Sequence, residues 1–160
     1  PLFRSRLTAA LKNLVAGKPN AADRNELDEL ARCDYTGKRI LLVEDNELNR
    51  EIAKEIIGMT GVSIECAENG REAVEKFTAA PVGYYDLIFM DIQMPLMNGY
   101  ETTAAIRAQT LHGGQTIPIV AMTANAFAED VVLSRNAGMN DHIAKPLDLN
   151  KLNDVLQQWL

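Results

Sequence analysis

Short apolar runs that alternate with amphipathic helical patterns constrain the fold of this chain more than any other feature. From residue 38 onward, runs of four to six residues rich in Ile, Leu, Val and Met recur between segments with apolar residues at helical spacing. Near-continuous apolar runs of this length are typical of parallel strands that are buried on both faces. We predict strands at residues 40–43, 62–67, 86–90, 117–122 and, with a weaker pattern, 141–144.

The segments between the predicted strands carry the signals of amphipathic helices. Asn46, Asn69 and Asp148 are residue types that cap helix N-termini, and apolar residues at helical spacing follow each of them. Helices are expected after each strand, over residues 46–58, 70–80, 99–108, 127–136 and 149–160. The side chains expected to face the core from the first two helices are Leu48, Ile52, Ile56, Ala73, Val74 and Phe77.

Five strand–helix units in succession favour one parallel sheet with helices on both faces, because right-handed crossovers connect parallel strands. The run at residues 62–67 alternates apolar and polar residues, as an edge strand does. We therefore predict an α/β protein with a flavodoxin-like, doubly wound sheet of five parallel strands, in the order 2-1-3-4-5, and five helices.

Composition and charge argue against several classes of function. The chain has 160 residues, of which 47% are hydrophobic and 24% are charged, as in ordinary globular domains. The net charge of −6 argues against direct nucleic-acid binding, and no apolar stretch approaches the roughly 20 residues that span a bilayer. Cys33 and Cys66 lack the spacing of a metal site, so we expect reduced thiols and a cytoplasmic location, with room for a membrane anchor elsewhere in a parent protein.

Polar residues follow four of the predicted strands at the point where each strand ends. Glu44 and Asp45 follow the first strand, and Asp91 follows the third. Thr123 and Lys145 follow the fourth and fifth strands. Ligands of parallel sheets bind beyond the carboxyl ends of the strands, so we expect these side chains to meet at one edge. Three carboxylates, a hydroxyl and an ammonium suit a hard divalent cation and a phosphoryl group.

Asp91 is the predicted centre of this site. An Asp at a strand end is often a turn former or helix cap, but Pro95 and the Asn98-Gly99 turn delay the next helix here. We therefore interpret Asp91 as a nucleophilic carboxylate that accepts a phosphoryl group, which is one of the known covalent roles of Asp.

The acidic pair after the first strand predicts the metal. Taken alone, Glu44 and Asp45 would be solvated loop acids. Convergence with Asp91 would bring three negative charges close together, an arrangement that a bound cation relieves. Mg²⁺ prefers oxygen ligands, and the main-chain carbonyl of Gln93 is expected to complete its shell.

Lys145 and Thr123 are predicted contacts of the phosphoryl group, although a surface lysine and a strand-end threonine are the plainer alternatives. Pro146 restricts the residue before it to extended geometry, which would hold the Lys145 stem at the sheet edge. The ammonium would then reach a phosphate oxygen as a point charge. A Thr123 hydroxyl that moves on phosphorylation would couple the site to the loop at residues 124–128.

Four motifs, in order along the chain, resemble the receiver domain of two-component response regulators. They lie at residues 41–46, 90–99, 121–124 and 144–147, and the resemblance covers residues 38–160. It implies that Asp91 is the phosphoacceptor and that Glu44 and Asp45 bind Mg²⁺. It also implies that Thr123 is the switch hydroxyl and that Lys145 contacts the phosphate.

The resemblance implies partners as well. Residues 90–95 are similar to receivers attached to hybrid sensor histidine kinases, so the expected donor is a histidine kinase or a histidine phosphotransfer protein. The helix at residues 46–58 would be the docking surface, and a charged residue in place of Ile52 would weaken transfer from protein donors while sparing small-molecule donors. The domain would phosphorylate itself with Mg²⁺ and would not be a turnover enzyme.

One position departs from the family pattern. Receivers often carry Tyr or Phe three residues before the lysine, where this chain has His142. A partly buried histidine without a switching role is one interpretation, and a charge-dependent switch at about pH 6–7 is the other. Gln93 and Asn125 occupy positions that tune hydrolysis of the acyl phosphate in the family.

The beginning of the chain echoes its last helix. The segment PLFRSRL at residues 1–7 aligns with PLDLNKL at residues 146–152. Chance similarity between short amphipathic helices is one explanation. The other, which we adopt, is that the chain is cut from a larger protein: residues 1–16 end a preceding receiver-like domain, residues 17–36 form a linker with a short helix, and residues 37–160 form the receiver domain.

Three other functions fit the same pattern less well. A hydrolase of the haloacid-dehalogenase type carries an acid two residues after its nucleophile, where this chain has Gln93. A flavin or nucleotide binder needs a glycine-rich turn after the first strand, where Glu44 and Asp45 stand. A degenerate receiver that only contacts proteins would lack an acid or the lysine, and all are present.

Overall fold

The sheet has the predicted topology. The structure, a computed structural model, describes residues 32–94, 97–123, 128–144 and 149–160. Five parallel strands form one sheet in the order β2-β1-β3-β4-β5. Their bounds are Arg39–Val43 (β1), Ser63–Ala67 (β2), Leu87–Asp91 (β3), Ile119–Thr123 (β4) and Asp141–Ala144 (β5). The flavodoxin-like prediction is therefore confirmed, including the edge position of β2.

Five α-helices connect and flank the strands in the part of the chain that is described. They are Glu47–Gly58 (α3), Gly70–Ala79 (α4), Gly99–Arg107 (α5), Ala128–Ala137 (α6) and Leu149–Trp159 (α7), with a 3-10 turn at Thr110–His112 (η1). Three helices begin at an asparagine whose side chain accepts a hydrogen bond from the backbone N–H three residues later, which satisfies a donor of the first turn. The capping residues are Asn46, Asn69 and Asn98.

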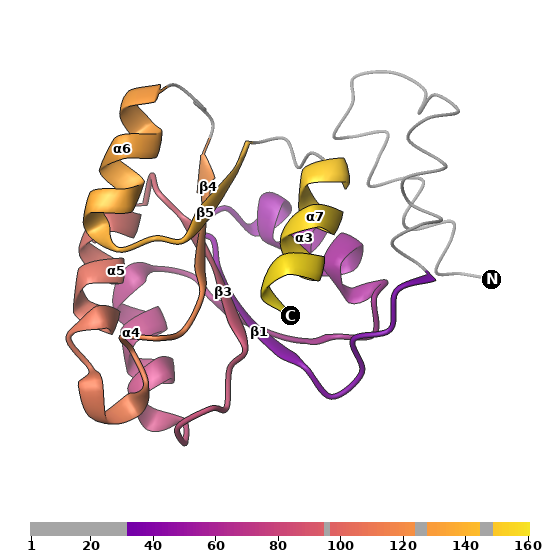
Figure 1. Ribbon diagram of the computed structural model, residues 1–160, viewed down its shortest axis with the longest axis horizontal. Coiled ribbons are helices and arrows are strands. Elements are labelled where there is room, and N and C mark those ends of the chain that lie inside the picture. The colour runs from indigo at the N-terminus through magenta and orange to yellow at the C-terminus, as the bar shows by residue number, and fades with distance from the viewer. Residues whose placement is uncertain (1–31, 95–96, 124–127, 145–148) are drawn as a thin grey trace.

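The helices form two layers around the sheet (Figure 1). Alternate strand residues face opposite sides, so Ile40 and Leu42 pack with α3 and α7, whereas Leu41 and Val43 pack on the side of α4 and α5. The residues of β1 from Ile40 to Val43 and all of those of β3 and β4 are buried, as expected for parallel strands covered on both faces. A well-packed core on each face fixes the relative height of the central strands and hence the position of their ends.

Two details of the sequence prediction needed correction. Leu48 was expected to face the core, but its side chain is 59% exposed, because the first turn of α3 lies beside the end of the sheet where there is no strand to cover. The fourth strand begins at Ile119, two residues later than predicted, after Pro118, which has no N–H to donate to a ladder. Ile52 and Ile56 are buried as expected.

The segment before β1 is described only from residue 32. The predicted domain end at residues 1–16 and most of the predicted linker at residues 17–36 lie outside the described residues, so these predictions stay untested. Tyr35 packs against the core on the side of α3 and donates its backbone N–H to the carbonyl of Thr60. Residues just before β1 thus belong to the packed domain.

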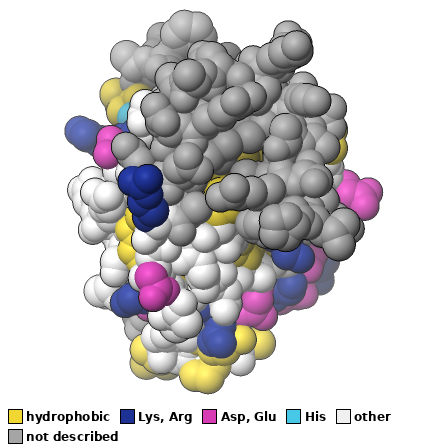
Figure 2. Space-filling view, turned by 90° about the vertical axis from the view of Figure 1, so that its right-hand side faces the viewer, with side chains coloured by type: hydrophobic (Ala, Val, Ile, Leu, Met, Phe, Trp, Pro, Cys, Tyr) yellow, Lys and Arg dark blue, Asp and Glu magenta, His cyan; other side chains and the backbone are white. Residues whose placement is uncertain are grey.

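The surface of the described part is polar and mixed in charge. On the face drawn in Figure 2, acidic and basic side chains are interspersed, and hydrophobic side chains gather at its lower end. Among the described helices, we find none that combines the length and the apolarity needed to cross a membrane. Among the residues that the structure describes, the large apolar side chains that are more than half exposed are Leu48, Val82, Leu111, Val132 and Leu133.

Candidate functional site

The register of the central strands brings the predicted site residues to one edge of the sheet. Val43, the last residue of β1, pairs with Met90, so Asp91 lies one residue further along β3. Asp91 in turn pairs with Met122, which places Thr123 one residue further along β4. Glu44 follows β1 directly. Three neighbouring strands therefore end in polar side chains at the same level.

Three carboxylates converge at this edge. One oxygen atom each from Glu44, Asp45 and Asp91 lies within 4.8 Å of the others. Glu44 and Asp91 are nearly fully buried, with 2% and 3% of their surfaces exposed, whereas Asp45 is exposed. The cluster is therefore closed on the protein side and reaches solvent at Asp45.

Backbone hydrogen bonds fix the chain on both sides of the cluster. The N–H of Glu44 donates to the carbonyl of Ala67 at 3.1 Å, which extends the pairing of β1 with β2 by one residue. The N–H of Asn46 donates to Glu44 Oε1 at 3.2 Å. On the other strand, the N–H of Gln93 donates to Asp91 Oδ1 at 3.3 Å. Two of the three carboxylates are thus oriented by main-chain donors.

Gly99 closes the loop that follows Asp91. Its N–H donates to the carbonyl of Ile92 at 2.9 Å. A Cβ atom at this position would lie 2.4 Å from the carbonyl oxygen of Asp91 and 2.8 Å from Ile92 Cα, so no other residue fits without moving the backbone. This close approach, together with the cap at Asn98, explains how α5 starts so near the acidic cluster.

The cluster has the chemistry of a divalent cation site. Three carboxylates at this separation repel one another, and a hard cation with oxygen ligands offsets the repulsion. Buried Glu44 and Asp91 with exposed Asp45 would leave open positions on the ion for water and phosphate oxygens, which is how Mg²⁺ is usually held. Gln93, whose carbonyl was predicted as a further ligand, is exposed on the loop after Asp91.

The other predicted site residues differ in what is described. Thr123 is the last residue of β4 and is 8% exposed, so the residue lies at the same edge, one position beyond the β4 partner of Asp91. Lys145 and Asn125 lie outside the described residues. His142 on β5 is partly buried, with its Nδ1 atom 3.9 Å from Asp141 Oδ1, and both interpretations of this histidine stay open.

Thiol chemistry finds no support at this edge. Both cysteines are thiols outside any disulfide and are only partly buried. Burial raises the pKa of the Cys66 thiol, and this effect outweighs the opposing charges of Lys54 and Arg50. A protonated thiol is a poor nucleophile and a poor metal ligand, so Cys66 acts as a small side chain of the β2 edge.

The predicted docking substitution on α3 was placed on the wrong residue. Ile52 is 6% exposed and packs in the core under α3, so a charge there would disrupt the fold before it affected any partner. Leu48 lies one turn earlier and is the exposed apolar side chain of this helix. Helical spacing places Ile52 and Leu48 on one stripe of the helix. They differ in burial because the core covers Ile52, whereas Leu48 lies beyond the end of the sheet.

Sequence reasoning missed Arg50. Its guanidinium Nη1 donates to the carbonyl of Glu44 at 3.1 Å, from the first turn of α3. No local pattern distinguishes this arginine from an exposed helical arginine, because the contact depends on how α3 packs beside the end of β1.

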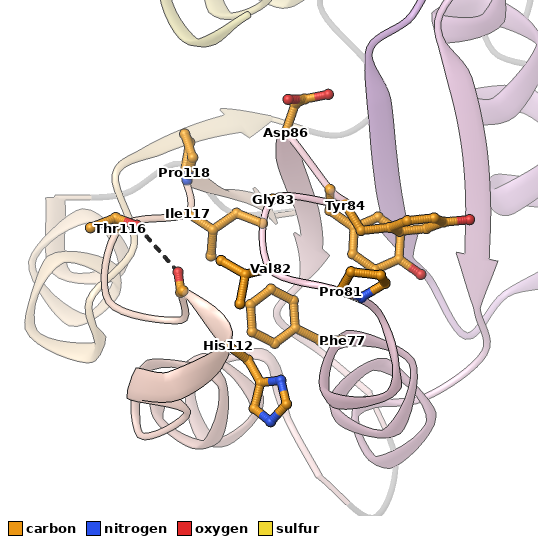
Figure 3. A pocket seen from close by; sticks show the side chains of 12 residues that line it. Phe77, Pro81, Val82, Gly83, Tyr84, Asp86, His112, Thr116, Ile117 and Pro118 are labelled. Carbon is orange, nitrogen blue, oxygen red and sulfur yellow. Dashed lines mark hydrogen bonds between the residues drawn. The ribbon is translucent and has the colours of Figure 1, made fainter.

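A cavity of about 250 Å³ lies at the opposite end of the sheet, beside the first residues of β3 and β4. The side chains of Phe77, Val82 and Ile117 point into it (Figure 3). Asp86 and Pro118, which line it, precede their strands. The cavity is therefore remote from the carboxylates and takes no part in their chemistry.

Comparison with known proteins identifies the family. A model of the response regulator receiver domain matches residues 40–157. The two-component response regulator ORR41 of Oryza sativa subsp. japonica is 41% identical over 125 residues, which cover 76% of this chain and 93% of that protein. Hybrid signal transduction histidine kinase A of Dictyostelium discoideum is 37% identical over 123 residues, 76% of this chain but 6% of the kinase.

Solved structures show the same fold. The receiver domain of a sensor histidine kinase from Pseudomonas aeruginosa, crystallised with a magnesium ion in its active-site cleft, is 38% identical with a TM-score of 0.69, covering 78% of this chain and 98% of that domain. A co-crystal structure from Saccharomyces cerevisiae pairs the receiver domain of Ssk1 with the histidine phosphotransfer protein Ypd1. It matches with 32% identity and a TM-score of 0.68, over 76% of this chain and 88% of that chain.

The relatives differ in what surrounds the shared domain. The chain spans 6% and 8% of two Dictyostelium discoideum hybrid kinases and 17% of probable histidine kinases of Oryza sativa. It spans nearly all of the response regulator. The family model covers residues 40–157, which include the five-stranded sheet and the three carboxylates at its edge. This chain therefore belongs to the response regulator receiver domain family of two-component signalling.

Proposed function

We propose that this domain is a phosphoacceptor of a two-component phosphorelay and that Asp91 receives the phosphoryl group. The observation that carries the proposal is the convergence of Asp91 with Glu44 and Asp45 at the carboxyl ends of β1 and β3. Asp91 is buried and oriented by the Gln93 N–H, which points one carboxylate oxygen in a defined direction. A carboxylate held in this way is prepared for in-line attack on phosphorus.

The transfer balances without a further reactant. An Asp91 carboxylate oxygen attacks the phosphorus of a phosphohistidine, the O–P bond forms as the N–P bond breaks, and the released imidazole nitrogen takes up a proton. The product is an acyl phosphate on Asp91. Glu44, Asp45, Asp91 and the Gln93 carbonyl would hold Mg²⁺, which when bound offsets charge on the transferring group.

Thr123 and Lys145 have supporting roles in this proposal. The Thr123 hydroxyl donates a hydrogen bond to a phosphoryl oxygen, and the Lys145 ammonium supplies a point charge to another. Support for Thr123 comes from its place at the end of β4, one residue beyond the partner of Asp91. Its movement toward the phosphoryl group would shift the loop that follows β4 and so change the surface offered to partners.

The proposed donor is a histidine kinase or a histidine phosphotransfer protein. Support comes from two kinds of relative: hybrid histidine kinases, and a receiver domain that was crystallised with a histidine phosphotransfer protein. The exposed Leu48 on α3, next to the acidic cluster, is the apolar contact that we assign to docking. We further propose a cytoplasmic setting within a hybrid kinase, with residues 1–16 as the end of a preceding receiver-like domain.

Intact-mass measurement with a small-molecule donor tests the proposal. Incubation of the protein with acetyl phosphate and Mg²⁺ should add one phosphoryl group, and the adduct should be lost in Asp91→Asn and in the presence of a chelator. A folded protein that binds Mg²⁺ but gains no adduct from acetyl phosphate or from a phosphorylated histidine phosphotransfer protein would contradict it. In that case the degenerate receiver, acting through protein contacts alone, would be the better description.

A further inference from the structure

Arg50 contacts the main chain of the acidic pair, Glu44 and Asp45. Its side chain is 12% exposed, although it belongs to a surface helix. The Nη1 atom donates to the carbonyl oxygen of Glu44 at 3.1 Å. The Nη2 atom lies 3.6 Å from Glu68 Oε1, in the turn after β2. One guanidinium therefore links α3, the end of β1 and the end of β2.

The contact with the Glu44 carbonyl is the informative one. This carbonyl belongs to the peptide bond that joins Glu44 to Asp45, and a peptide unit is a rigid plane. A hydrogen bond that fixes its oxygen fixes the plane, and the Cα atoms of both acids lie at the two ends of that plane. The planar guanidinium fork is itself rigid, so the bond restrains rotation of the peptide as well as distance.

The contact with Glu68 contributes less. The Glu68 side chain is 68% exposed, and the separation of 3.6 Å exceeds that of a good charged hydrogen bond. Exposed ion pairs of this kind contribute little to stability. The partly buried Nη1 bond is a stronger restraint, because breaking it would cost the Glu44 carbonyl this donor away from bulk solvent.

We propose that Arg50 is a positioning residue for the acidic pair: its bond to the Glu44 carbonyl orients Glu44 and Asp45 toward Asp91. The metal-binding consequence rests on the proposed function. A competing effect has the opposite sign, because a cation beside three carboxylates also repels Mg²⁺. If orientation dominates, removal of Arg50 weakens Mg²⁺ binding; if repulsion dominates, removal strengthens it.

The first experiment measures loop order in the metal-free protein. Amide hydrogen exchange, followed by NMR, is compared for wild type, Arg50→Gln and Arg71→Gln. Arg71 is a matched control because it is also a helical arginine paired with a glutamate, but 83% exposed. In Arg50→Gln, exchange of the Glu44 and Asn46 amides should accelerate roughly fivefold or more, with no change in the central strands and no effect of Arg71→Gln.

Glu68→Gln decides which contact of Arg50 matters. The proposal expects wild-type exchange at both loop amides in Glu68→Gln, since the Nη1 bond stays. Unchanged exchange in Arg50→Gln, or equal acceleration in Glu68→Gln, would overturn it.

The second experiment measures Mg²⁺ affinity by isothermal titration calorimetry, without a phosphodonor. Arg50→Gln should bind Mg²⁺ about tenfold more weakly than wild type, as expected when a group that orients metal ligands is lost. Affinity equal to or tighter than wild type would overturn the proposal. Ile57→Val is the stability control, because Ile57 is fully buried in α3 away from the cluster and its truncation destabilises the fold without touching the loop.

The two experiments separate this proposal from the proposed function. If wild type neither binds Mg²⁺ nor accepts a phosphoryl group, the proposed function fails, whereas the amide exchange still decides whether Arg50 orients the acidic pair. If wild type is phosphorylated and Arg50→Gln retains wild-type affinity and exchange, the positioning role fails alone.

Discussion

Asp91 shows how much of the site depends on the placement of single residues. It is the last residue of a fully buried strand, so its backbone is fixed by pairing with Met122, while its carboxylate faces the two acids of the neighbouring strand end. Only 3% of its surface is exposed, whereas the neighbouring Asp45 is exposed to solvent. A carboxylate in a mobile loop would have no fixed orientation and would not lie beside two other carboxylates.

Gly99 offers a test of this placement at the scale of one methyl group. Gly99→Ala should destabilise the protein by about 1–3 kcal/mol, because the new Cβ would lie 2.4 Å from the carbonyl oxygen of Asp91 and must push the loop away. Urea unfolding measures the loss. The phosphorylation rate with acetyl phosphate should also fall, since the displaced loop carries the N–H that orients Asp91.

Gly58→Ala is the matched control for Gly99→Ala. Gly58 ends α3, and a Cβ there would meet only Ile64 Cδ1, at an ordinary 3.9 Å. The substitution should be neutral or stabilise the helix by up to about 1 kcal/mol. Equal stability of the two alanine variants would show that the close approach at Gly99 does not restrain the loop.

Individual site residues were predictable from sequence to different degrees. Glu44, Asp45 and Asp91 were identified because each follows a strand-like run, and parallel strands end at a common edge. Arg50 was missed because its contact with a carbonyl depends on the tilt and height of α3, which no local pattern encodes. Leu48 was misassigned for the same reason.

Among the elements, α3 is the one that the account assigns to partner docking. Leu48→Glu should leave the fold intact, because the side chain is already 59% exposed. It should slow phosphotransfer from a phosphorylated histidine phosphotransfer protein by about tenfold, since loss of a well-placed apolar contact costs about 1–2 kcal/mol, while acetyl phosphate reacts as before. Stopped-flow or quench-flow transfer assays measure both rates.

Val132→Glu is a suitable control for Leu48→Glu. Val132 is 56% exposed on α6 and so introduces the same charge at a similarly exposed apolar position on another element. Transfer slowed equally by both variants would indicate a general effect of charge and would remove the assignment of docking to α3.

A second element-scale interaction ties β5 to α7. Asp141 at the start of β5 lies 3.2 Å from Lys151 Nζ and accepts a hydrogen bond from Trp159 Nε1 at 3.4 Å. Burial opposes ionisation of this carboxyl, but the His142 N–H and Lys151 outweigh it and hold the Asp141 pKa below its usual value of 3.8. The charged form therefore stabilises the fold above the pKa of the unfolded chain.

Asp141→Asn should remove this pH-dependent contribution. Because the folded pKa is lowered, wild type should exceed the variant in unfolding free energy by about 1 kcal/mol at pH 6, as for a net hydrogen bond, and the difference should shrink as the pH falls through the folded pKa. Urea unfolding at several pH values, followed by the fluorescence of the single tryptophan, measures it. A difference that stays constant down to pH 2.5 would contradict the assignment.

Element types were predictable, and element boundaries less so. The apolar runs and the asparagine caps determined where strands and helices lie, because both signals are local. The start of β4 at Ile119 was missed, since the apolar residues Ile117 and Pro118 continue the run although they precede the ladder. Ile117 and Pro118 line the cavity that precedes β4, together with the neighbouring loop. The conformation of that loop decides whether such apolar residues join the strand.

For the whole molecule, the clustered charges predict that Mg²⁺ binding and folding are linked. Addition of Mg²⁺ at about 100 times its dissociation constant should stabilise the fold by about 2.7 kcal/mol and raise the melting temperature by roughly 5–10 °C. Chelation should reverse the shift. Differential scanning calorimetry with and without Mg²⁺ measures it.

Asp45→Asn should change the melting temperature in a different way with Mg²⁺ than without it. Without metal, the variant should melt at a higher temperature than wild type, because one of three mutually repelling charges is removed. With metal, it should gain less than wild type, because an anionic ligand is lost. A variant that is less stable than wild type without Mg²⁺, or that gains the same shift, would argue against a shared cation site.

The overall fold was predictable because the sequence shows five successive strand–helix units and few topologies accommodate them. Repeated strand–helix units admit a doubly wound sheet, and the right-handed crossover rule removes most alternatives. The long-range tertiary contacts were beyond reach. Arg107 donates all five of its N–H groups to oxygens at Gly114, Ile117, Gly138 and Asn140, joining the end of α5 to the segments before β4 and β5. Nothing in the order of residues indicates these partners.

Locating the phosphoryl group on the chain is the sharpest test of Asp91 as the phosphoacceptor. The protein is phosphorylated with acetyl phosphate and Mg²⁺, treated with borohydride, which reduces an aspartyl phosphate to homoserine, and mapped by peptide mass spectrometry. The account predicts homoserine at position 91 and none in protein kept without Mg²⁺. Reduction at Glu44 or Asp45 instead, or a phosphoryl group that stays on a side chain other than Asp91, would contradict it.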